Sequence, residues 1–152
     1  MIDIAKARAT KFTKADQKLL AVWAADCAEH VLPYFEKKFP GDDRPRQAIA
    51  ACRTWAQTGV FKMADVRRDS LNAHAAARTA PEDSPARFAA RAAGQAVATA
   101  HVATHALGAA WYGVKAAKAA GKSGEREREW QFRHLPKQLH LRVLSVMAAK
   151  KI

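Results

Sequence analysis

The sequence lacks the features that define several large classes of protein. It has two cysteines, Cys27 and Cys52, and no CxxC motif, which removes the zinc-finger and thioredoxin-type patterns. No apolar run reaches the ~18–20 residues of a transmembrane helix, and the basic N-terminus has no central apolar stretch of a secretory signal. No glycine-rich phosphate loop occurs. We therefore expect a cytoplasmic protein without a membrane association, in which both cysteines are buried free thiols.

Valine, isoleucine and aromatic residues are scarce, whereas alanine occupies 36 of the 152 positions. This composition favours packed helices over a β-sheet. We predict an all-α fold with seven or eight helices and short loops, in one compact domain over residues 13–152 that follows a basic N-terminal arm over residues 1–12. The alanine-rich stretch 85–120 is too long for one straight helix, and we place a break at 105–108 to give a central helix pair.

Helix boundaries are marked by capping residues and prolines. Thr13 and Ser84 each precede a helical pattern and are predicted N-caps, as is Asp43 before a third helix. Pro33 is expected to end the first helix, and Gly59 to close the helix that Asp43 begins. The apolar positions of these helices predict the following core: Trp23, Cys27, Ile49, Cys52, Trp55, Leu71, Leu107, Trp111, Leu139 and Val143.

The net charge is +12, and residues 1–18 and 115–152 carry ten of these twelve excess positive charges. A nucleic-acid-binding domain more often has a basic stripe along one element. The long middle of this chain, residues 19–114, is nearly neutral. Within the basic C-terminal stretch, the alternating segment EREREW at 125–130 is typical of a solvated helix. Nucleic-acid binding is therefore expected to be weak.

Two histidines stand at metal-ligand spacing. His101 and His105 are four residues apart in a stretch predicted to be helical, so their imidazoles would share one face. A zinc site needs at least one more ligand, which the local sequence does not supply. We favour hydrogen bonds from Asp26, Glu29, His74, an arginine or trapped water over a bound metal.

The segment DDRPR at 42–46 forms a second polar group. Asp43 is expected to cap the helix while Asp42 pairs with Arg46 near the positive helix end. The alternative is a polar pocket that this group, together with Arg53, builds with Glu29, His74 and Arg78 from adjacent helices. Arg87 and Arg91 share a face, and we expect them either to bind phosphate or a partner carboxylate or to pair with Glu82 and Asp83. All candidate pocket or partner-binding residues are Asp26, Glu29, Asp42, Asp43, Arg44, Arg46, Arg53, His74, Arg78, Arg91, His101 and His105.

Five runs of sequence carry a family resemblance: WAADCAEHVLPYFE, DDRPRQAIAACRTW, AHAAAR, ARAAGQAVATAHVATHALGAAWY and EREWQ with a nearby LP. Together they resemble a bacterial family called putative immunity proteins, over roughly residues 14–146. The resemblance implies an all-helical fold and a protein that neutralises a toxin by direct binding. It implies no catalytic residue, no cofactor and no metal.

Three functions follow from these observations. The first is a binding protein of the immunity type, whose partner is a cognate toxin. Its basic charge would complement an acidic toxin surface better than a basic nuclease. The second is a helical enzyme or metal protein that uses the His, Asp and Glu groups. The third is a basic protein that associates with nucleic acid non-specifically.

The charge distribution predicts weak, salt-sensitive binding to duplex DNA. Deletion of residues 1–12 should weaken this binding further, because the arm contributes positive charge. The measurement is a DNA-binding titration at several salt concentrations, in which affinity should fall steeply as salt is raised. Tight binding that survives about 200 mM salt with a sequence preference would contradict this expectation.

Overall fold

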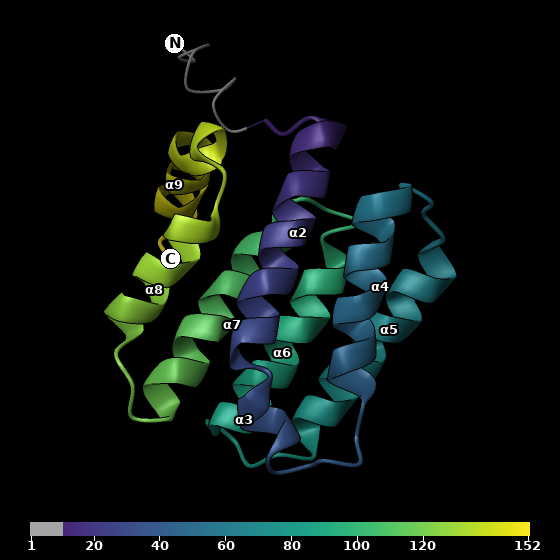
Figure 1. Cartoon of the computed structure of the whole chain (residues 1–152), viewed down its shortest axis with the longest axis vertical. Helices are drawn as coiled ribbons and strands as arrows, with labels where there is room; N and C mark the ends of the chain where they lie inside the picture. Colours follow the sequence, from purple (N-terminus) through teal and green to yellow (C-terminus); the bar gives the residue numbers. More distant parts are fainter. Residues whose placement is uncertain (1–10) are drawn as a thin grey trace.

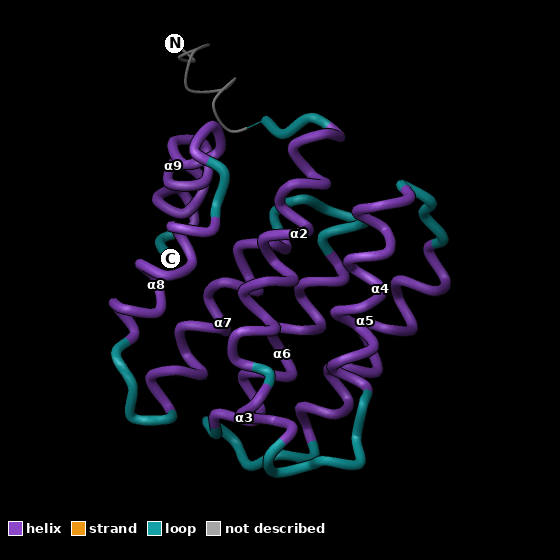
Figure 2. The backbone as a smooth tube through the Cα atoms, in the orientation of Figure 1, coloured by secondary structure: helices purple, strands orange, loops and turns teal. Residues whose placement is uncertain are grey.

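A computed structural model describes residues 11–152, and every regular element within that range is helical (Figure 2). The long helices are α2 (Lys14–Val31), α4 (Arg44–Thr58), α5 (Met63–Arg78), α6 (Pro85–Ala98), α7 (His105–Ala119), α8 (Gly124–His134) and α9 (His140–Lys150). A single helical turn, α3 (Pro33–Glu36), follows α2, and the 3-10 turn η1 (Lys137–Leu139) precedes α9. The predicted all-α class is confirmed. Residues 1–10 of the predicted basic arm lie outside the described residues.

Helix α6 lies at the centre of the bundle and contacts α2, α3, α4, α5 and α7 (Figure 1). The inward-facing side chains of α6 are small. Its buried residues are Ala86, Ala89, Ala90, Ala92, Ala93, Gly94, Ala96 and Val97. Small side chains let neighbouring backbones approach closely, so one helix can be surrounded by several others. Between residues 11 and 152, no helix is both long enough and apolar enough to cross a bilayer.

Most predicted helix boundaries are present. Thr13 and Asp16 form a capping box, in which each side chain accepts a hydrogen bond from the backbone N–H of the other. The Ser84 hydroxyl accepts from the backbone N–H at the third position of α6. Gly59 closes α4 with a positive φ of 68°, which glycine adopts without steric cost. Pro33 separates α2 from α3 as expected.

One predicted boundary is wrong, and one predicted N-cap residue stands in its place without making the capping hydrogen bond. Asp43 occupies the N-cap position of α4, but its carboxylate accepts from the Gln47 side chain instead of a backbone N–H. The break in the alanine-rich stretch falls at residues 99–104, before the predicted 105–108. Here the buried Gln17 donates through Nε2 to the carbonyl oxygens of Thr99 at 2.8 Å and of Ala100 at 3.1 Å. A side chain from α2 therefore satisfies carbonyls at the end of α6.

Eight of the ten predicted core residues are buried. Leu71 is the clear error, because its side chain is 56% exposed. Leu71 lies on α5, an outer helix that packs against α4 and α6. The apolar residues of α5 are divided between the face that packs on these helices and the face exposed to solvent. Trp111 is only partly buried, because it lines a pocket between α7 and the end of α9.

We predict that Gly94→Ala destabilises the fold. A Cβ atom at this position would lie 2.7–2.9 Å from three atoms of the His74 ring, so α5 and α6 would have to separate. Overpacking of this kind costs about 1–3 kcal/mol, and the better helix propensity of alanine offsets about 1 kcal/mol of that. Chemical denaturation should show a net loss of stability.

The matched control is Gly41→Ala, since a Cβ at Gly41 meets no atom within 4 Å. Its stability should stay within about 0.5 kcal/mol of the parent protein. A Gly94→Ala variant that is more stable than the parent would show that the bundle can absorb the methyl group.

Candidate functional site

The candidate acidic residues of α2 lie against α4. Arg53 extends from α4 and donates through one guanidinium nitrogen to Asp26 at 2.9 Å and to Glu29. Because the three side chains are partly exposed, this cluster stabilises the α2–α4 contact only modestly. The charges of Arg53 and Glu29 are paired in this cluster, so they are not available to the alternative polar pocket.

The DDRPR segment forms different ion pairs from those predicted. Asp42 does not pair with Arg46. It makes a bidentate pair with Arg44, at 2.9 and 2.7 Å, because the fork of a guanidinium two residues away matches the carboxylate. Arg46 instead donates to Glu36, just before the α3–α4 connection, at 2.7 and 2.6 Å. Both arrangements hold the carboxyl pKa of the acidic partner below its usual range, chiefly through the arginine hydrogen bonds.

The predicted pocket that would join Glu29, His74 and Arg78 is not formed. Glu29 belongs to the Arg53 cluster, whereas His74 hydrogen-bonds with Arg91 across the α5–α6 contact. Arg78 is exposed at the end of α5. The candidate residues are thus divided between two sides of the bundle.

His74 is an interior histidine held neutral. Arg91 donates to its Nδ1 at 2.9 Å, so the imidazole proton is on Nε2. Burial, with smaller contributions from the positive charges of Arg91 and Arg78, lowers the pKa of His74 to about 4. The pairs predicted between Arg91 or Arg87 and the acids at 82–83 are not seen. Arg87 donates to a backbone carbonyl, that of Ala80.

The histidine pair at 101 and 105 is not on one helical face. His105 begins α7, but His101 lies in the turn after α6, where it is exposed and stacks on Phe61 with ring centroids 6.1 Å apart. His105 donates from Nδ1 to the side-chain oxygen of Gln95 at 2.8 Å. Burial lowers its pKa, with smaller contributions from His101 and Lys150. The predicted partners were therefore wrong, and the actual one is a neutral amide.

Gln95 is the main residue missed in this region. It follows Arg91 by one helical turn, so the two side chains extend from the same side of α6 and each contacts a histidine. The four-residue spacing of two long polar side chains on an otherwise alanine-rich helix could have identified this side of α6 from the sequence.

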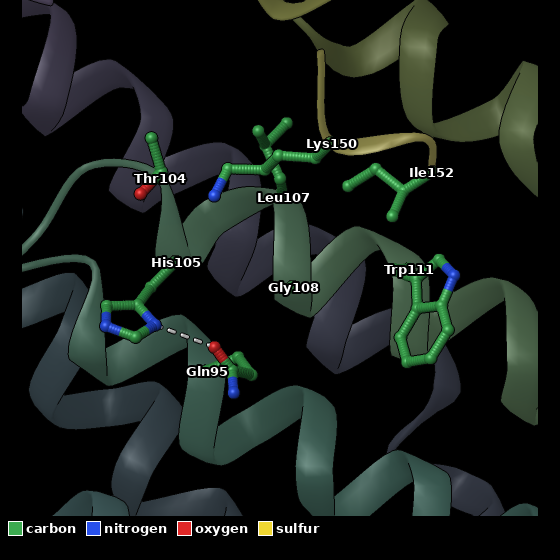
Figure 3. A pocket seen from close by; sticks show the side chains of 8 residues that line it. All are labelled: Gln95, Thr104, His105, Leu107, Gly108, Trp111, Lys150 and Ile152. Atoms are coloured by element: carbon green, nitrogen blue, oxygen red, sulfur yellow. Dashed lines mark hydrogen bonds between the residues drawn. The ribbon is translucent and has the colours of Figure 1, made fainter. Parts of the chain in front are cut away.

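Beside His105 is a cavity of about 280 Å³ (Figure 3). Its lining residues are Gln95, Thr104, His105, Leu107, Gly108, Trp111, Lys150 and Ile152. Figure 3 shows the His105–Gln95 pair on one side, with Lys150 and Ile152 reaching over α7 from the end of the chain. No Asp, Glu or Cys side chain occurs among these lining residues, and His105, the one imidazole there, is already hydrogen-bonded to Gln95.

A third polar cluster joins α2 to α8. Glu127 is nearly buried and accepts from His30 at 2.6 Å, and the Trp130 ring is stacked between His30 and His134, with centroids 3.7 and 4.1 Å away. The alternating charges of this segment predicted that the whole helix is solvated. This prediction is wrong for Glu127, whose side chain is nearly buried. Only the tertiary contact with α2 distinguishes this glutamate from its exposed neighbours.

The thiols and the remaining metal-binding residue types do not gather into a reactive site. Cys27 and Cys52 are buried and free, as predicted. Burial raises the pKa of the Cys27 thiol well above its ordinary value and that of Cys52 to about 12, so both are protonated near neutral pH. Within residues 11–152, no three His, Cys, Asp or Glu side chains are placed to hold one metal ion.

These observations define a class: an all-α bundle in which the polar residues singled out by sequence mostly pair with one another. Residues 10–138 of the chain match the family described as Imm-5 like putative immunity protein, and the chain belongs to that family. Comparisons with curated proteins and with solved structures gave no significant match.

We predict that His74 makes stability depend on pH below neutrality. Its pKa is about 4 in the folded protein, against an ordinary value of 6.5. Between these values the unfolded chain binds more protons, so stability should fall as pH drops from about 6.5 toward 4. In His74→Gln, whose amide oxygen can accept from Arg91, the melting temperature should decline less over this range.

The control is His101→Gln, which replaces an exposed imidazole and leaves the buried one in place. Its melting temperature should follow that of the parent protein at each pH. Parallel curves for the parent and His74→Gln would show that His74 does not cause the acid sensitivity.

Proposed function

We propose that this protein neutralises a cognate bacterial toxin by binding it directly. The observation that carries the proposal is membership of the immunity family over residues 10–138. The internal pairing of the candidate residues supports a binding role over a catalytic one. Arg53, His74 and His105 each have a partner within the chain, and these contacts stabilise the bundle.

The distribution of ion pairs supports an acidic partner. In the described part of the chain, the ion pairs use arginine or histidine as the cation. No lysine takes part in these pairs, so lysines contribute much of the uncompensated part of the +12 net charge. A surplus of exposed ammonium groups attracts a negatively charged surface and accelerates association with it.

The test is co-expression with the product of a neighbouring reading frame that inhibits growth when it is expressed alone. We expect growth to be restored and the two proteins to co-purify as a complex. Because a binding protein must occupy each toxin molecule, protection should require at least equimolar amounts. Association should also slow by about tenfold or more when salt is raised, since steering by exposed charges is screened.

A dose series separates this proposal from the enzyme alternative. Protection at strongly substoichiometric levels, with the toxin released in a chemically altered form, would contradict direct neutralisation. Growth inhibition that persists without complex formation would contradict it for that toxin.

A further inference from the structure

One end of the bundle carries exposed apolar side chains on two neighbouring connections. These are Val60, Phe61 and Met63, at or beside the α4–α5 connection, and Val102, in the turn between α6 and α7. We call these four residues the end patch. Their exposed fractions lie between 40% and 64%. The two connections lie at the same end as the start of α2 (Figure 1), and the stacking of Phe61 on His101 joins them. A cluster of this kind on loops is unusual, because exposed apolar residues are normally scattered.

The backbone presents the end patch in a defined conformation. Gly59 turns the chain with a positive φ, and the Thr58 hydroxyl accepts a hydrogen bond from the Val60 N–H at 3.2 Å. The same hydroxyl donates to the Thr54 carbonyl at 2.9 Å. Helix α5 begins three residues after Val60, at Met63. A surface that is already ordered loses little conformational entropy when a partner binds.

A cavity of about 400 Å³ lies beside the end patch, between the end of α4 and the start of α5. Val60 and Trp55 contribute to its lining. Trp55 is buried, and its indole N–H has no hydrogen-bond partner among the described residues. A buried donor without an acceptor is uncommon, and the Trp55 indole is the single case among the described residues.

The charges around this end are mainly positive. Lys18 reaches Gly59 at the start of the loop, Lys14 lies 5.8 Å from the centre of the Trp55 ring, and Lys62 precedes α5. The acids nearby, Asp65 and Asp69, both pair with Arg68. An apolar centre with lysines at its rim is complementary to an apolar segment flanked by carboxylates.

We infer that the end patch is the surface on which the protein binds its partner, and that the partner presents an apolar segment flanked by acidic side chains. This inference rests on the proposed function, because it takes the toxin to be that partner. Phe61 and Met63 would be covered on binding, while Lys14 and Lys18 would face the carboxylates at the rim.

Two arms test the end patch, and both use the full chain. In the first, the immobilised protein selects binders from a random-peptide library, with no toxin present. Enriched peptides should combine acidic with apolar residues. Their affinity should fall at least tenfold for Phe61→Asp and for Met63→Asp.

In the second arm, the same variants are tested against the growth-inhibiting protein of the neighbouring reading frame. Both should lose complex formation and protection. Lys18→Glu should slow association, whereas Lys118→Glu, the same charge change at the other end of α7, should leave the rate near that of the parent protein.

The matched apolar controls are Leu141→Asp and Leu71→Asp. These leucines are 79% and 56% exposed, on α9 and α5, away from the two loops. Both controls should bind as the parent protein does. Melting curves check each variant for folding, and Phe61→Ser replaces Phe61→Asp if the aspartate variant melts early.

The outcomes separate the surface from the proposed function. If the parent protein binds the toxin and the end-patch variants bind equally well, the inference is overturned and the proposed function stands. If no toxin binds, the peptide arm decides. Enriched peptides that no longer bind the Phe61→Asp variant support the end patch as the binding surface. Peptides that still bind this variant, or a selection without enriched peptides, overturn the inference.

Discussion

The close approach of helices around α6 is the constraint on which the rest of the structure depends. This helix offers almost only methyl groups to its neighbours, so α2, α4, α5 and α7 can all reach it. At Gly94 even a methyl group is absent, and the His74 ring occupies the space that a Cβ would fill. This packing also brings polar groups of three helices within hydrogen-bond distance. On α6, Arg91 contacts His74 of α5 and Gln95 contacts His105 of α7.

Arginines and lysines have different roles in this protein. Arg44 and Arg46 make fork-shaped contacts with a carboxylate at the start of α4, and Arg53 joins two carboxylates of α2 to the body of α4 through one guanidinium nitrogen. The ammonium groups of Lys14 and Lys115 instead lie over aromatic rings near the surface. The first set stabilises the contacts of α4, and the second leaves positive charge accessible to a partner.

The sequence predicted the features that depend on local chemistry. Thr13, Pro33, Gly59 and Ser84 act through backbone groups a few residues away, so their effects follow from neighbouring residues alone. The turn at 99–104 was misplaced because Gln17, which lies 82 residues from Thr99, supplies its hydrogen bonds. The His101–His105 expectation failed for the same reason, since it assumed that the helix continued. Of the candidate site, the individual residues could be named, but their partners depend on which helices pack together.

The alanine-rich centre also has a thermodynamic consequence. Alanine has no side-chain rotamers to lose on folding, so α6 pays almost only the backbone entropy of becoming ordered. Each methyl group also removes little apolar surface from water, so α6 contributes less to the heat capacity change of unfolding than a leucine-rich helix would. Large apolar side chains contribute more per residue, and three of the largest that are fully buried, Trp23, Phe35 and Leu139, lie on other elements. The helix that sets the geometry of the bundle is therefore not the one that supplies most of its large buried side chains.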